Sequence, residues 1–90
     1  MNNVINKFSL EGKIAVVTGA LGLLGMQHCF ALSEAGAIVI VCDLDRIKCD
    51  EFAKQLPGIA HGFHLDVTVS NCLVNLKTFV QHRYGKLDIL

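Results

Sequence analysis

The sequence has no tryptophan, one proline and one tyrosine among its 90 residues, and its formal net charge at neutral pH is zero. Its eight basic and eight acidic residues are mixed along the chain, without the charged stretches that bind nucleic acid or acidic lipids. No apolar run approaches the length of a membrane span, and residues 1–13 lack the basic start and apolar centre of a signal peptide. These absences predict a cytoplasmic protein with no nucleic-acid or membrane partner.

Metal-binding motifs are also missing. The chain has four cysteines, which are Cys29, Cys42, Cys49 and Cys72. None of them forms a C-x-x-C pair, so buried free thiols are expected rather than a zinc or redox site. His61 and His64 are three residues apart on a predicted strand. This spacing places them on opposite faces of the strand, where they cannot share a metal ion.

What the sequence does contain is an alternation of apolar runs and helical patterns in a chain that is 52% hydrophobic. Strands are predicted at 14–18, 37–43, about 60–66 and from 87 onward; helices are predicted at about 21–35, at 46–56, and from about 70 to 84. Alternating strands and helices predict right-handed crossovers and a parallel sheet. We therefore expect an incomplete, doubly wound, Rossmann-like α/β domain, β-α-β-α-β-α-β, with strand order 3-2-1-4.

The helix patterns also predict caps and apolar faces. Asp45 is a plausible N-cap for the second helix, and Thr68 or Ser70 for the third. The first helix is expected to carry apolar residues at Leu23, Leu24, Met26, Phe30, Ala31, Leu32 and Ala35. The apolar face expected for the second is Ile47, Cys49, Phe52, Ala53 and Leu56, and for the third Val69, Cys72, Leu73, Leu76, Phe79 and Val80.

A glycine-rich turn connects the first strand to the first helix, with the pattern Thr-Gly-x-x-Gly-x-x-Gly from residue 18 to residue 25. Gly19 would allow a sharp turn, Gly22 would let a diphosphate approach the backbone, and Gly25 would let the helix pack tightly against the sheet. A strand, a glycine turn and a helix N-terminus together direct backbone N–H groups at a phosphate, here near Leu23 and Leu24. The alternative is a tight turn without a ligand.

Two aspartates follow the next two strands, at the edge of the sheet where ligands of parallel sheets bind. Asp43 is placed to accept hydrogen bonds from the adenosine ribose, and its charge favours NAD over NADP, although Arg46 lies three residues on. Asp66 could accept from the adenine amino group while Val67 packs on the ring. The alternative for each aspartate is a turn or helix-capping role. The candidate cofactor contacts are Gly19, Leu21, Gly22, Leu23, Leu24, Gly25, Asp43, Leu44, Asp66 and Val67.

These motifs resemble the short-chain dehydrogenase/reductase family over nearly the whole chain. The resemblance is carried by Phe8-x-Leu10-x-Gly12-Lys13, Ala15 to Gly19, Asp43, Asp66-Val67-Thr68 and Gly85 to Leu90. It implies NAD(P)-dependent hydride transfer between nicotinamide and an alcohol or ketone, with Gly19, Leu24, Asp43, Asp66 and Val67 as cofactor contacts. One departure is that the main branch has its middle glycine at the position of Leu23, whereas Gly22 is similar to the extended branch.

The family's catalytic Tyr-x-x-x-Lys pair does not occur in the sequence. Tyr84 is followed four residues later by Asp88, so it cannot fill that role, and no catalytic residue is predicted. We expect residues 1–90 to be the N-terminal part of one NAD(P)-binding domain whose catalytic part is absent. The complete protein is expected to act on a small molecule and to form a homo-oligomer. Alternatives are a nucleotide-sugar epimerase or dehydratase, or a non-catalytic remnant or nucleotide-binding module.

Overall fold

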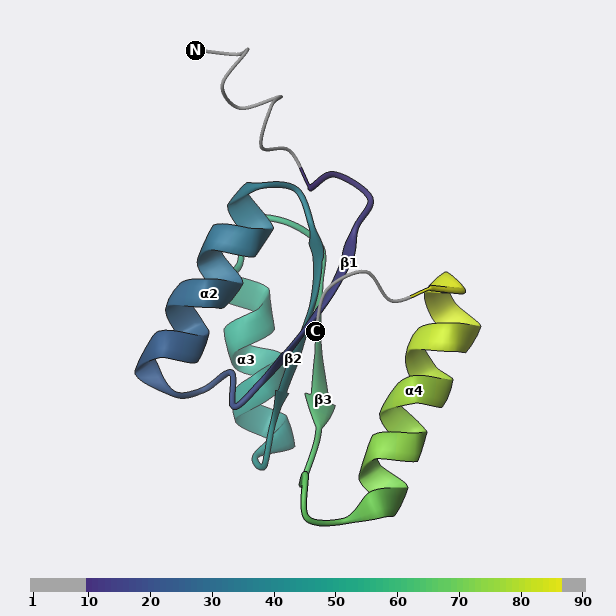
Figure 1. Ribbon diagram of the computed structural model, residues 1–90. Helices are drawn as coiled ribbons and strands as arrows, with labels where there is room; N and C mark the ends of the chain where they lie inside the picture. Colours follow the sequence, from purple (N-terminus) through teal and green to yellow (C-terminus); the bar gives the residue numbers. More distant parts are fainter. Residues whose placement is uncertain (1–9, 87–90) are drawn as a thin grey trace, which may run out of the picture.

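The computed structural model describes residues 10–86, which form three layers (Figure 1). The strands are β1 (Ile14–Thr18), β2 (Ile38–Asp43) and β3 (Ala60–His64), and the helices are α2 (Leu23–Glu34), α3 (Arg46–Gln55) and α4 (Ser70–Tyr84). The strands form a parallel sheet in the order β1-β2-β3. Helices α2 and α3 cover one face of this sheet and α4 covers the other (Figure 1).

This arrangement confirms the Rossmann-like α/β class and the 3-2-1 part of the predicted strand order. The fourth strand and Phe8 lie outside the described residues, so the position of strand four stays a prediction. The third strand is shorter than predicted and ends at His64 instead of Asp66. It ends there because Asp66 turns back on Thr68 and begins the connection to α4.

The alternation of side chains along the strands divides the core into two clusters. On one face, Ala15 of β1 and Val39 and Val41 of β2 pack with Cys49 and Phe52 of α3. On the other face, the apolar side chains of β1 and β2 pack with those of α4: Ile14, Val16, Ile40, Cys42, Leu76 and Val80. Both clusters are nearly free of solvent contact, which explains why the first two strands are continuous apolar runs.

The predicted apolar faces of the helices are partly wrong. Leu23 and Leu24 are 77% and 64% exposed, and Ile47 at the start of α3 is 70% exposed. The buried positions of α2 are instead the smaller Cys29 and Ser33. The three exposed residues lie in the first turns of their helices, beside the carboxyl ends of the strands and not over the core.

The predicted helix caps have a mixed outcome. Asp45 caps α3 as expected, because its Oδ1 accepts from the Lys48 N–H at 3.1 Å. Neither Thr68 nor Ser70 caps α4; the N-cap is Val69, which provides no side-chain hydrogen bond. The Thr68 hydroxyl instead donates a hydrogen bond of 2.6 Å to Asp66 Oδ1.

Candidate functional site

The glycine turn leaves the carboxyl end of β1 and leads into α2. Gly19 has a φ of +62°, a left-handed backbone conformation that residues other than glycine rarely adopt. A Cβ on Gly25 would lie 2.4 Å from the Gly19 carbonyl oxygen and 2.9 Å from Ala20 Cα, so the helix touches the turn at this point. Both positions therefore need glycine for the turn itself, and Gly25 packs against the turn rather than the sheet.

Gly22 is different from the other two glycines. It is the N-cap of α2, with φ −70° and ψ 160°, and a Cβ there would meet the Gly19 oxygen at an ordinary 3.4 Å. Within residues 10–86, packing does not demand glycine at this position. The open backbone above Gly22 is the space that a diphosphate would need for close approach.

The N-terminus of α2 has the electrostatic character of an anion site. The first N–H groups of a helix have no acceptor within it and carry partial positive charge. No side chain caps this terminus and its first turn contains no acidic residue, so nothing in the helix itself neutralises it. The side chains of Leu23 and Leu24 extend into solvent beside these N–H groups.

Asp43 joins the three segments that meet at this edge of the sheet. Its Oδ2 accepts from the Leu21 N–H at 2.9 Å, which ties the glycine turn to the end of β2. Its Oδ1 accepts from the Leu44 N–H at 2.7 Å, and its backbone oxygen accepts from the Leu65 N–H at 2.9 Å. An ionised carboxylate has about four acceptor sites, so both oxygens retain room for ligand hydroxyls.

Asp66 occupies the end of the third segment. Its Oδ1 accepts from both the N–H and the hydroxyl of Thr68, at 2.9 and 2.6 Å. The Thr68 hydroxyl and N–H lower the pKa of the Asp66 carboxyl, with a further contribution from His64. The turn-forming role of Asp66 is therefore present in the structure. The Asp66 residue is only partly exposed, yet its carboxylate is charged at neutral pH and remains able to accept a further hydrogen bond.

Two exposed apolar side chains stand next in sequence to these aspartates. Leu44 is 63% and Val67 62% exposed. Solvent-exposed aliphatic groups beside two carboxylates provide apolar contact and hydrogen-bond acceptors together, the combination that a flat, polar-edged ring such as adenine requires. Binding by any of the ten candidate contacts stays a prediction.

Arg46 has a partner that was not considered in the sequence-based interpretation. Its Nε lies 3.2 Å from Asp50 Oδ2, one helical turn along α3. The i, i+4 spacing of opposite charges was the signal in the sequence that could have revealed this pair. Because of it, Arg46 is directed along its own helix. Among the described residues, no group of three histidine, cysteine or acidic side chains could hold a metal ion.

The fold and the site together define a class: parallel α/β proteins with a glycine turn at a helix N-terminus and an acidic residue after the second strand. The family model for short chain dehydrogenase matches residues 13–90. The chain belongs to the short-chain dehydrogenase family.

Two curated relatives illustrate the similarity. The chain is 33% identical to tropinone reductase-like 1 of Erythroxylum coca over 81 residues, which cover 90% of this chain and 30% of that protein. It is 33% identical to the 7alpha-hydroxysteroid dehydrogenase of Escherichia coli (strain K12) over 84 residues, covering 90% and 33%. The chain thus spans about a third of the length of the curated relatives it matches.

The backbone of this chain is also similar to solved structures of short-chain oxidoreductases and dehydrogenases. A metagenomic short-chain oxidoreductase in complex with NADP superimposes with a TM-score of 0.85 at 28% identity, covering 90% of this chain and 38% of that one. A hydroxysteroid dehydrogenase from Escherichia coli gives a TM-score of 0.83 at 31% identity, covering 90% of this chain and 35% of that one.

Within residues 10–86, the structure contains no helix with the length and apolar character of a membrane span.

Proposed function

We propose that this chain is the cofactor-binding part of an NAD-dependent short-chain oxidoreductase, which transfers hydride between nicotinamide and an alcohol or ketone. The observation that carries the proposal is the hydrogen bond from the Leu21 N–H to Asp43 Oδ2, which holds the glycine turn against the acidic end of β2. The names of the relatives, reductases and dehydrogenases, support the reaction class. In its complete form we expect a cytoplasmic homo-oligomer that acts on a small molecule.

The residues present fit a dinucleotide. The open backbone at Gly22 and the uncapped N-terminus of α2 would hold the diphosphate. Asp43 would accept from the ribose hydroxyls and Asp66 from the adenine amino group, with Leu44 and Val67 against the ring. When bound, the nicotinamide would accept the hydride from an alcohol or donate it to a ketone, and these residues would bind and orient the cofactor.

The preference for NAD over NADP follows from charge. In the proposed binding mode the Asp43 carboxylate would face the 2′-phosphate of NADP, and like charges repel. Arg46, the nearest cation in sequence, is held by Asp50. One solved relative is in complex with NADP, so this preference is a property to be measured for this chain.

Tyr84 does not serve as the proton donor in this proposal. Its hydroxyl is hydrogen-bonded to His61, near the start of β3. The glycine turn lies at the other end of the strands, where β1 leads into α2. We therefore assign no proton-transferring role to Tyr84.

The test is the affinity of NAD⁺ and NADP⁺, measured by titration calorimetry on the parent, Asp43→Ser and Asp45→Ala. The parent should bind NAD⁺ at least about tenfold more tightly than NADP⁺, and Asp43→Ser should lose most of this ratio. Asp45→Ala is the matched control, because it removes the α3 cap at a cost of about 1 kcal/mol without removing any of the candidate cofactor contacts. Equal affinities for both nucleotides in the parent would refute the NAD preference. Absence of binding to either would refute the cofactor site.

A further inference from the structure

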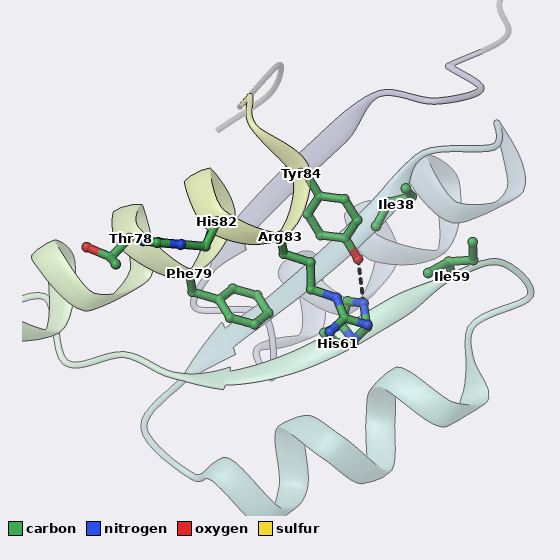
Figure 2. A pocket seen from close by; sticks show the side chains of 8 residues that line it. All are labelled: Ile38, Ile59, His61, Thr78, Phe79, His82, Arg83 and Tyr84. Atoms are coloured by element: carbon green, nitrogen blue, oxygen red, sulfur yellow. Dashed lines mark hydrogen bonds between the residues drawn. The ribbon is translucent and has the colours of Figure 1, made fainter.

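A second concave site lies at the opposite end of the sheet from the glycine turn. It is an open hollow of about 860 Å³ between the last turns of α4 and the starts of β2 and β3 (Figure 2). Ile38 is the first residue of β2, whereas Asp43 is the last, so the full length of the strand separates the two sites. The proposed cofactor site does not use any residue of this hollow.

The walls of the hollow are apolar and aromatic. Ile38 comes from β2, Ile59 directly precedes β3, and Phe79 projects from α4 (Figure 2). The Phe79 ring meets the His61 ring edge to face, with centroids 6.2 Å apart. These side chains form surfaces against which a flat apolar group can lie.

A hydrogen-bonded pair stands at the centre of the hollow. His61 Nε2 and the Tyr84 hydroxyl are 2.5 Å apart and join β3 to the end of α4 (Figure 2). Burial and the nearby Arg83 both lower the pKa of His61, which favours the neutral ring. A neutral imidazole has one N–H and one acceptor nitrogen, so the pair can still offer a hydrogen-bonding group to a ligand.

Arg83 gives the hollow its charge. Its side chain extends across His61 in Figure 2, and it has no carboxylate partner among residues 10–86. None of the residues that line the hollow is acidic. Asp50 is the acid of the neighbouring hollow, which shares His61 and Phe79, and it is paired there with Arg46. Within the described part of the chain, the hollow thus combines apolar walls with a guanidinium that has no carboxylate partner.

We propose that this hollow is a binding site for a small anion with a flat apolar body, of which an aromatic carboxylate is the simplest example. The carboxylate would accept from the Arg83 guanidinium, which presents two parallel N–H groups to a planar anion. The ring would lie between Phe79 and the two isoleucines. The volume is within the range of small-molecule pockets.

The test is equilibrium dialysis of the whole chain, with and without saturating NAD⁺. The probe is 2-naphthoate, and the uncharged comparison compound is 2-naphthylmethanol. A ligand of this size in an open site should bind with a Kd on the order of 1 mM. Arg83→Gln should weaken naphthoate binding by about fivefold or more and leave the alcohol unchanged. Ile59→Ser, at a largely exposed wall position, should weaken both probes.

Lys48→Gln is the charge-matched control, because it removes one exposed positive charge from α3 without altering the hollow. Its affinity for naphthoate should equal that of the parent, and far-UV circular dichroism should show the same helix content in every variant. The proposal is overturned if naphthoate does not bind at about 10 mM, if Arg83→Gln binds it as tightly as Lys48→Gln, or if NAD⁺ displaces it.

Discussion

Replacing Gly25 by alanine tests whether the glycine turn and α2 are in contact as the structure has them. The added Cβ would lie 2.4 Å from the Gly19 oxygen and 2.9 Å from Ala20 Cα, both backbone atoms. An ordinary contact is 3.4 Å or more, so the turn and the helix would have to separate by about 1 Å. A backbone shift of this kind costs about 1 to 3 kcal/mol.

An opposing effect must be weighed against this cost. Alanine is favoured over glycine inside a helix by up to about 1 kcal/mol. At the middle of its range the clash exceeds the gain in helix propensity by about 1 kcal/mol, so Gly25→Ala should lower the melting temperature by about 4 to 8 °C in a domain of this size. Gly22→Ala is the matched control, because its Cβ would be only at van der Waals contact and the N-cap position changes stability by less than about 1 kcal/mol.

Gly25→Ala should mainly lower thermal stability, whereas Gly22→Ala should mainly lower the affinity for NAD⁺. Thermal melts followed by circular dichroism at 222 nm should show a clear loss of stability for Gly25→Ala and a smaller loss for Gly22→Ala. Calorimetric titration with NAD⁺ should show about fivefold or greater weakening for Gly22→Ala, because its methyl group enters the space proposed for the diphosphate. If Gly25→Ala melts with the parent, the close contact between turn and helix is refuted. Equal destabilisation by both substitutions would refute the distinction between them.

Two further predictions follow from pKa values. His61 has a lowered pKa in the folded chain, so the unfolded chain binds more protons and stability should fall as the pH drops through about 6.5; His61→Gln should show a smaller difference in melting temperature between pH 7.5 and pH 5.5, and an unchanged difference would contradict the assignment. Burial raises the pKa of Cys29 to about 11 and of Cys42 to about 12, and also raises that of Cys49. In a thiol assay with Ellman's reagent at pH 8, partly exposed Cys72 should therefore react first and the other three only on unfolding, whereas four equal rates would show that the core is open.

The order and type of the elements could be predicted because each depends on neighbouring residues. The apolar run 14–18 is a strand with the predicted bounds, and Asp45 caps α3 from three residues before Lys48. The glycine positions also follow from local chemistry: Gly19 must adopt a positive φ where the chain leaves the strand. Local patterns therefore located both the turn and the acidic strand end.

Which side chains reach the core could not be predicted from helical spacing alone. The apolar pattern of α2 favoured Leu23 and Leu24, yet Cys29 and Ser33 are its buried positions. Helical periodicity gives a relative face but no reference to the sheet, and it does not show where along the helix the sheet ends. Ser33 is buried because its Oγ accepts from the Gly58 N–H at 2.9 Å, a contact between residues 25 positions apart.

Local residue patterns were enough to predict a parallel α/β unit, a glycine turn between the first strand and the first helix, and two aspartates after consecutive strands. Two other features depend on how the chain packs: Asp43 accepts a hydrogen bond from the Leu21 N–H, and His61 is hydrogen-bonded to Tyr84 beside Arg83. They could not be predicted because the residues in contact are far apart in the sequence. Strand, helix and turn preferences arise from steric and hydrogen-bonding terms within a few residues, whereas these contacts join residues more than 20 positions apart and form only when the helices pack on the sheet.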